Sequence, residues 1–353
     1  MTSDLIPIEP SALTLAGQVA NQIAGAGVFS DYRARLATNT QHRQDNDLAL
    51  FADYLGALTL PAGDFASDPA AWQGMTWGLV AGFVRWLLAA GYAVTTVNLA
   101  LTTVKNYARL AAQAGTLDPQ ELTLIKAIKG YKRAEGKHID ELRESARRST
   151  RRNGTRANKK TLPVSLTPAQ AEQLKTQPDT PQGRRDRFIM CLFLDHGLRV
   201  GELARLTIDC FDLKAGEMKF YRPKVDKVQT HRLTADTLAA ARAYLAQDAP
   251  ALGPVLRGSR KGKGSKHDQP GGGVLTNQGL TARAITQRVT DLGAALGIAS
   301  LSAHDLRHSW ATQAARAGTP LERLQDAGGW SSLAMPARYI EAAKIANAGV
   351  KLG

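Results

Sequence analysis

The sequence predicts a mainly α-helical protein with a small antiparallel β-sheet (an α+β fold), organised as two domains. Three observations support this fold class. The chain has 353 residues, which corresponds to about two domains, and 44% of them are apolar, enough to build a core in each. Apolar residues recur at helical spacing between residues 48 and 110 and again after residue 280. Between residues 209 and 233, apolar and polar residues instead alternate, as they do in β-strands.

The first half contains three segments whose apolar residues fall on one side of a helix. They are Leu48, Leu50, Phe51, Tyr54 and Leu55; Leu79, Phe83, Trp86 and Leu87; and Leu99, Val104, Tyr107 and Leu110. We expect a helical domain over residues 28–137, preceded by an N-terminal extension of residues 1–27. The apolar stretch 77–94 contains Arg85 and three glycines, so it is interpreted as a helix packed against protein and not as a membrane span.

The second domain is expected over residues 163–353 and begins with helices. Residues 166–174 and 188–206 have helical patterns, and Thr167 and Pro168 have the residue types of a helix start. A hairpin follows. Met218 and Phe220 alternate with polar neighbours beyond a turn at 214–216, and residues 228–233 are expected to add a strand.

The positive charge is concentrated between the two domains. The net charge is +14, and residues 126–160 hold thirteen Lys or Arg against four acidic residues. This composition predicts a basic linker, residues 138–162, that contacts a polyanion such as DNA. Taken alone, the charge run is explained equally well by a solvated charged surface, but its position between two helix-periodic regions favours the linker. The expected contact residues are Arg147, Arg148, Arg151, Arg152, Arg156, Lys159 and Lys160. A second basic cluster in the Gly-rich stretch 257–273 predicts a mobile loop.

Several functional classes are disfavoured by what the sequence lacks. Cys191 and Cys210 have neither disulfide-framework nor zinc-ligand spacing, so a reducing cytoplasm is the expected compartment. The first ten residues lack the basic start of an export signal. Gly253 and Gly258 have P-loop spacing, but Ser259 and Arg260 follow them, which argues against nucleotide binding.

Four local patterns in the second half together suggest a chemical site. The first is 197–203, Gly-Leu-Arg-Val-Gly-Glu-Leu, in which Arg199 and Glu202 are three residues apart; alone it is an ordinary ion pair. The second is the hairpin, which carries the candidate lysines Lys224 and Lys227. The remaining two are the His-Asp-Leu-Arg-His segment 304–308 and Gly-Gly-Trp at 328–330, followed nine residues later by a tyrosine.

The histidine segment also has the spacing of a zinc site, because His304 and His308 are four residues apart. The glutamate of a His-Glu-x-x-His motif is absent, and Arg307 between the two histidines would repel a cation. We therefore expect neither a metal nor a cofactor.

These four patterns, in this order, resemble the tyrosine recombinase family of phage integrases and Cre-like and Xer-like enzymes. The resemblance covers about the last 190 residues, and the helical region before it is similar in layout to the core-binding domain of the family. It implies a site-specific recombinase that cleaves and rejoins DNA through a covalent 3′-phosphotyrosyl intermediate, without ATP. The chain is also compatible with a type IB topoisomerase or a non-catalytic DNA-binding protein of the same fold.

The resemblance implies roles for individual residues. Tyr339 would be the nucleophile, and Arg199 and Arg307 would hold the non-bridging phosphate oxygens. His304 would bind the same phosphate or manage the tyrosine proton, and Trp330 would donate its indole N–H. Lys224 would protonate the leaving oxygen, with Lys227 as the alternative. Glu202 and His308 would support the site.

The resemblance also implies partners. Recombination needs two double-stranded DNA sites and four protomers, so a homotetramer assembled on DNA is expected. The first 27 residues lack the basic, strand-rich pattern of an arm-type DNA-binding domain. No membrane partner is expected.

Overall fold

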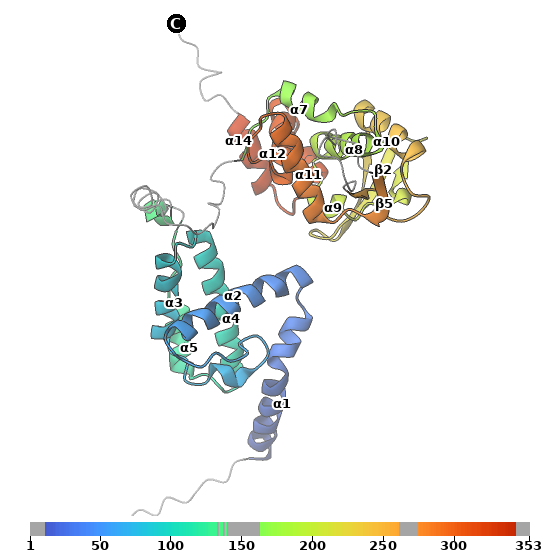
Figure 1. Ribbon diagram of the computed structural model, residues 1–353. Helices are drawn as coiled ribbons and strands as arrows, with labels where there is room; N and C mark the ends of the chain where they lie inside the picture. Colours follow the sequence, from blue (N-terminus) through green and yellow to red (C-terminus); the bar gives the residue numbers. More distant parts are fainter. Residues whose placement is uncertain (1–10, 133, 137, 140–162, 261–273, 344–353) are drawn as a thin grey trace, which may run out of the picture. The chain divides into compact units, whose positions relative to one another are not determined.

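The computed structural model describes residues 11–132, 134–136, 138–139, 163–260 and 274–343 (Figure 1). The chain divides into two compact units, residues 1–159 and 160–353. Both are mainly helical, and the second also contains two small antiparallel sheets. This confirms the predicted mainly α fold with a small amount of antiparallel β-structure.

The first unit is built from helices, most of which begin at a capping side chain, such as Thr76 or Asp118. Its elements are α1 (Ala12–Ala34), α2 (Thr38–Ala57), the 3₁₀ helix η1 (Pro69–Trp72), α3 (Trp77–Ala89), α4 (Val94–Gln113) and α5 (Pro119–Ala127). Helix α1 crosses residue 28, where the helical domain was expected to begin. Most of its side chains are exposed, and only Gly25 and Phe29 are buried, which explains why the sequence shows no clear apolar period there.

The core of the first unit is aromatic. The rings of Phe51, Trp72, Phe83 and Tyr107 are each fully buried, and α4 lies against α2, α3 and α5. The three predicted helical segments fall within α2, α3 and α4. Leu99, which was expected on the same side as Val104, Tyr107 and Leu110, is 49% exposed and is not part of the buried stripe of α4.

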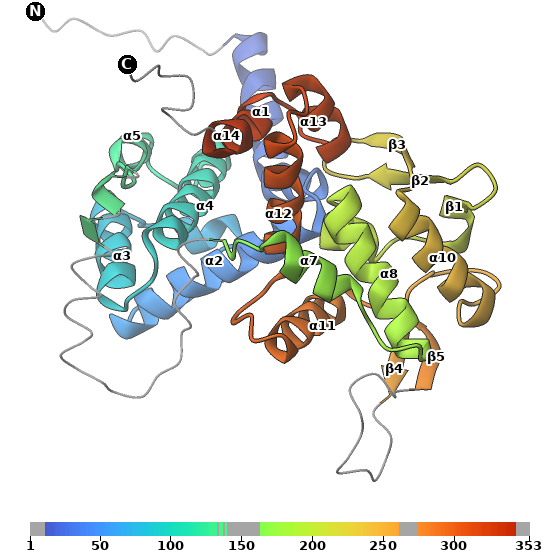
Figure 2. The ribbon, with the colours of Figure 1, turned by 90° about the horizontal axis from the view of Figure 1, so that it is seen from above.

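In the described part of the chain, the second unit contains eight α-helices and two small sheets. Its helices are α7 (Pro168–Lys175), α8 (Pro181–His196), α9 (Val200–Leu203), α10 (Ala235–Gln247), α11 (Ala282–Ala295), α12 (Ala303–Arg316), α13 (Leu321–Gly328) and α14 (Ala334–Ala343), of which α9 is a single turn. The 3₁₀ helix η2 is Ile208–Cys210, and the strands are β1 (Phe211–Asp212), β2 (Glu217–Arg222), β3 (Lys227–Arg232), β4 (Arg257–Arg260) and β5 (Val274–Gly279). Helix α12 is central, since α8, α11, α13 and α14 all pack on it (Figure 2).

The helix expected over residues 188–206 is interrupted. Helix α8 ends at Gly197, whose φ of +59° is left-handed, and the chain resumes as the single turn α9. A Cβ at Gly197 would lie 2.1 Å from the Trp310 ring, so the turn and the packing both require glycine. The prediction of one continuous helix was therefore wrong, and the break places Arg199 at the start of a new turn.

The main sheet has the order β1-β2-β3 and is antiparallel throughout. Met218 and Phe220 are buried while Lys219 and Tyr221 are exposed, which confirms the predicted alternation. The Gly-rich cluster is not only a loop, because β4 and β5 pair on either side of it; residues 261–273 lie outside the described residues. In the described part of the chain, no helix has the length and apolar character needed to cross a bilayer.

Candidate active site

Arg199 and Glu202 are locked together at the start of α9. The carboxylate of Glu202 accepts the backbone N–H of Arg199 at 2.8 Å and its Nη1 at 2.7 Å. Glu202 is 4% exposed, whereas the Arg199 side chain remains 23% exposed. The spacing-based expectation of an ion pair is thus met, and the pair fixes an arginine that still reaches the surface.

Arg307 is buried on α12, which begins with a capping box between Ser302 and Asp305. Its guanidinium donates to the carbonyls of Gly197 and Gly328, at the C-terminal ends of α8 and α13. These helix ends carry partial negative charge, which favours a cation. Burial, together with the positive charge of Arg199 and of a third arginine, Arg222, lowers the pKa of Arg307 to about 9.

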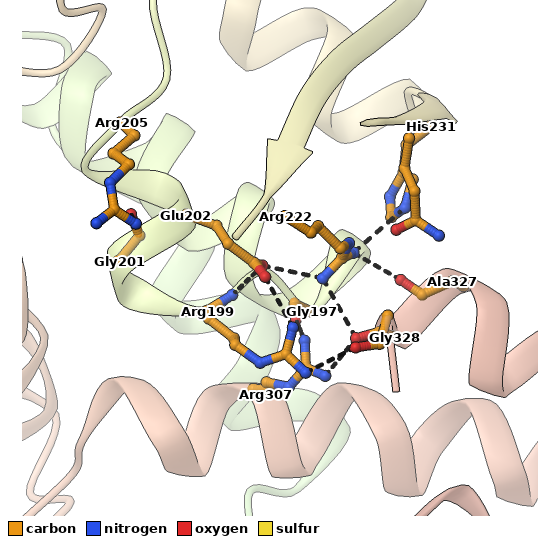
Figure 3. Close-up of polar contacts among 12 residues, drawn as sticks. Gly197, Arg199, Gly201, Glu202, Arg205, Arg222, His231, Arg307, Ala327 and Gly328 are labelled. Atoms are coloured by element: carbon orange, nitrogen blue, oxygen red, sulfur yellow. Dashed lines mark hydrogen bonds and ion pairs between the residues drawn. The ribbon is translucent and has the colours of Figure 1, made fainter. Parts of the chain in front are cut away.

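Arg222 was not predicted from the sequence. It is the last residue of β2, is fully buried, and donates to Glu202 at 2.9 Å and to the carbonyls of Ala327 and Gly328 at 2.7 and 3.2 Å (Figure 3). A signal was present, because Arg222 continues the inward-facing positions of β2. A charged residue at an inward strand position needs buried partners.

The charges in this cluster do not balance. Arg199 and Arg222 both bond the carboxylate of Glu202, whereas Arg307 donates to the backbone carbonyls of Gly197 and Gly328 (Figure 3). The excess positive charge is consistent with the lowered pKa of Arg307 and creates a site that an anion would stabilise. A guanidinium presents a planar fork that matches phosphate geometry.

Tyr339 and Trp330 lie beside the arginines. Tyr339 is on α14 and is 5% exposed. Its ring centre is 5.6 Å from that of Trp330 and 4.9 Å from that of His308, which meets it edge-on. Burial raises the pKa of Tyr339, and the charges of Arg307 and Arg199 act in the opposite direction. The buried phenol is thus close enough to the arginines for them to favour its ionised form.

His304 and His308 lie on the same side of α12, with ring centres 4.8 Å apart. Burial is the main cause that lowers the pKa of both, and the charge of Arg307 adds to it. Both imidazoles are therefore neutral at pH 7. Among the described residues, no group of three His, Cys, Asp or Glu side chains has an arrangement that could hold a metal ion.

The two candidate lysines differ in their surroundings. Lys227, on β3, forms an ion pair with Asp326 at 2.8 Å. Lys224 is exposed in the β2–β3 turn, two residues after Arg222. The structure thus leaves Lys224 at the surface and attaches Lys227 to α13. The predicted linker contacts Arg147, Arg148, Arg151, Arg152, Arg156, Lys159 and Lys160 lie outside the described residues.

Comparison with known proteins gives matches to phage integrases and tyrosine recombinases. The sequence pattern of the phage integrase family matches residues 165–345, just over half of the chain. Tyrosine recombinase XerD of Lacticaseibacillus casei is 27% identical over 285 residues, covering 74% of this chain and 93% of the relative. Tyrosine recombinase XerC of Roseiflexus castenholzii is 25% identical over 309 residues, covering 86% and 83%.

Solved structures share the fold. The integrase of transposon Tn1549, in complex with a circular-intermediate DNA, is similar with a TM-score of 0.57 and 16% identity, over 89% of this chain and 94% of that chain. A lambda integrase dimer bound to a core site is similar with a TM-score of 0.59 and 12% identity, over 98% and 85%. At these identities the likeness shows the fold.

Proposed function

This chain belongs to the phage integrase family, and on that premise we propose that it is a site-specific recombinase that cleaves and rejoins DNA strands through Tyr339. The observation that carries the proposal is the unbalanced positive cluster beside the tyrosine. Arg199 and Arg222 share the carboxylate of Glu202, while Arg307 bonds backbone carbonyls, and its pKa is lowered by burial and by the other two arginines. A DNA phosphodiester supplies the missing negative charge.

The reaction begins with attack of the Tyr339 oxygen on the phosphorus. The new bond joins the tyrosine oxygen to the 3′-phosphoryl group, and the bond from phosphorus to the 5′-oxygen breaks. The leaving 5′-oxygen takes a proton from Lys224. Because the phosphodiester energy is kept in the tyrosyl ester, a 5′-hydroxyl of a partner strand can reverse the step without ATP.

The remaining residues stabilise the transition state. Arg199 and Arg307 hold the two non-bridging oxygens, whose negative charge grows as the phosphorus becomes five-coordinate. Trp330 donates its indole N–H to the same phosphate. His304 is neutral at pH 7, so it can accept the phenol proton of Tyr339. Glu202 fixes Arg199, and His308 packs against Tyr339.

The partner of this site is double-stranded DNA. In this proposal residues 28–137 form the core-binding domain and residues 163–353 the catalytic domain, with the basic linker 138–162 following the phosphate backbone. Four protomers on two DNA sites exchange the strands.

The test is capture of the covalent intermediate. The protein is incubated with fragmented DNA from its own source, denatured, and the protein-linked DNA ends are sequenced. Tyr339→Phe keeps the ring and removes the nucleophilic oxygen, so adducts should vanish. Tyr221→Phe is the matched control, because it removes the hydroxyl of an exposed tyrosine of the same unit and should still form adducts at the same DNA sites.

Each outcome has a distinct meaning. Adducts at one or a few sites through 3′ ends, lost only in Tyr339→Phe, support the recombinase. Adducts scattered over all sequences would indicate a topoisomerase-like enzyme. Adducts that survive in Tyr339→Phe would overturn the assignment of the nucleophile. DNA retention without adducts in any variant would indicate a non-catalytic DNA-binding protein.

A further inference from the structure

We propose that Arg222 is a positioning residue that holds the turn carrying Lys224 against the end of α13, so that the lysine meets the leaving oxygen. This inference rests on the proposed function, in which Lys224 supplies the proton. Arg222 is the last residue of β2, and Lys224 follows two residues later in the β2–β3 turn. Fixing Arg222 therefore restricts where Lys224 can lie.

The contacts of Arg222 reach three separate parts of the second unit. One nitrogen, Nη1, donates to Glu202 at 2.9 Å and to the Gly328 carbonyl at 3.2 Å. The other, Nη2, donates to the Ala327 carbonyl at 2.7 Å and lies 3.4 Å from His231 Nε2. A single buried guanidinium thus ties β2 to α9 and to the end of α13 (Figure 3).

The same carbonyls serve the proposed phosphate clamp. The Gly328 carbonyl accepts from Arg307 as well as from Arg222, and the Gly329 carbonyl accepts from Arg199 at 2.8 Å. The carbonyls of residues 327–329 therefore form a common frame. Arg199 and Arg307, which hold the phosphate in the proposed function, and Arg222, which belongs to the hairpin, all donate to it. A displacement of the hairpin relative to this frame moves Lys224 relative to the phosphate.

The fit of Arg222 against this frame is tight. A Cβ at Gly329, where φ is +57°, would lie 2.4 Å from Cδ of Arg222. The arginine stem thus packs directly on the backbone of residue 329. A methionine would fill much of this space but could not donate a hydrogen bond, and a lysine could donate from only one nitrogen.

Two other side chains join the hairpin to α13. Lys227 pairs with Asp326, but both are more than half exposed, and exposed ion pairs contribute little. Gln229 Nε2 donates to the Asp326 carbonyl at 2.7 Å and is 7% exposed. We call the contacts of Arg222, Lys227 and Gln229 with α13 the hairpin seam. Arg222 is its fully buried member, Gln229 is nearly fully buried and Lys227 is exposed.

The test separates positioning of the proton donor from other losses. Cleavage rates are measured on two DNA substrates that differ in one atom, the 5′-bridging oxygen or a sulfur in its place. A thiolate leaves as a stable anion and needs no proton, so a defect in protonation disappears on the sulfur substrate. We expect Arg222→Met to cleave the oxygen substrate about 100-fold more slowly and the sulfur substrate at nearly the wild-type rate.

Controls connect this result to the lysine. Lys224→Ala should show the same rescue by sulfur, and Arg222→Lys should recover part of the rate on oxygen. Arg232→Met, an exposed arginine at the far end of β3, should have no effect on either substrate. Melting temperature and DNA affinity identify a variant that fails to fold. If Arg222→Met fails to fold, Gln229→Ala, which loosens the hairpin seam, replaces it, and the proposal then requires that Gln229→Ala cleaves the oxygen substrate slowly and the sulfur substrate at nearly the wild-type rate.

Equal loss on both substrates by a folded Arg222→Met would overturn the proposal, since the defect would then lie in the phosphate clamp. A Lys224→Ala variant that cleaves the sulfur substrate as slowly as the oxygen substrate would also overturn the proposal. In either case, adducts on Tyr339 would leave the proposed function intact. If the wild type forms no adduct with either substrate, both fail.

Discussion

The guanidinium carbon of Arg307 lies 4.6 Å from the ring centre of Trp330. The same indole ring is 5.6 Å from the ring of Tyr339, so Trp330 lies close to both the proposed anion-binding arginine and the proposed nucleophile. A cation over an aromatic face is attracted to it, and burial strengthens that attraction. Trp330 therefore packs against both Arg307 and Tyr339.

Trp330→Phe tests the indole apart from the ring. Phenylalanine keeps a flat face for Arg307 and Tyr339 but lacks the indole N–H, so we expect adduct formation to slow by about 10-fold to 100-fold, with folding retained. Trp330→His, which restores a ring N–H donor, should cleave faster than Trp330→Phe. Single-turnover adduct formation measures both. A Trp330→Phe enzyme with the wild-type rate would show that the N–H does not contact the phosphate.

Arg307→Lys tests the planar fork of the clamp. Lysine keeps the charge but cannot donate to both the Gly197 and Gly328 carbonyls while facing a phosphate. We expect the cleavage rate to fall by about 100-fold to 1,000-fold, with DNA affinity reduced much less. The exposed Arg316→Lys at the end of the same helix should change neither quantity. Equal losses of rate and affinity would instead assign Arg307 to DNA binding in the ground state.

The sequence predicted the parts of the site that follow local patterns. The helix start at Thr167 and Pro168 and the spacing of Arg199 and Glu202 depend on neighbours within one turn, and the structure contains both. The alternation of Met218 and Phe220 with exposed residues likewise follows from the pleat of one strand.

What the sequence did not reveal depends on contacts between distant segments. Arg222 is buried only because Glu202 and the carbonyls of residues 327–328 surround it, and they lie 20 and more than 100 positions away. The local sequence around Gly197 predicts a continuous helix. The reason for the break is that the Trp310 ring, from a distant segment, occupies the space that a Cβ at residue 197 would need. Helix α1 is exposed along most of its length, so no apolar period marks it.

Glu202→Ala should destabilise the protein strongly. The carboxylate is the partner of both Arg199 and the fully buried Arg222, and removing it leaves a buried guanidinium without its counter-ion. Breaking one side of a buried pair costs about 3–5 kcal/mol in the free energy of unfolding. Urea denaturation measures this cost, and the exposed Glu172→Ala provides the comparison. A loss under about 1 kcal/mol would show that solvent or the carbonyls compensate Arg222 without Glu202.

Gly329→Ala should lower both stability and activity. The residue has a φ of +57°, and its new Cβ would meet Cδ of Arg222. Gly318→Ala is a matched control, because Gly318 also has a positive φ, +81°, but has open space around it. The backbone conformation costs each variant about 1–2 kcal/mol, and only Gly329→Ala should lose more and cleave slowly. Equal stability losses with unchanged cleavage in both would show that Arg222 moves aside freely.

His196, at the end of α8, lies close to His231, on β3. The rings of His196 and His231 are 5.7 Å apart, and His196 is 4% exposed. Burial lowers the pKa of His196 to about 4 and that of His231 to about 3. Asp195 opposes the shift of His196, and Arg222 adds to that of His231. Neither imidazole can take up a proton in the folded protein near pH 6.

This pair predicts a loss of stability in mild acid. The ordinary histidine pKa is 6.5, so the unfolded chain binds protons below that pH while the folded chain does not until about pH 4. The free energy of unfolding should therefore fall as the pH drops from 6.5 to 4, by about 1.4 kcal/mol per unit for each histidine. His196→Gln removes one such group and should flatten the slope by that amount, whereas the exposed His42→Gln should not. Urea denaturation at pH 7, 6 and 5 measures the slope, and identical slopes in His196→Gln and the wild type would mean that His196 is protonated in the folded protein.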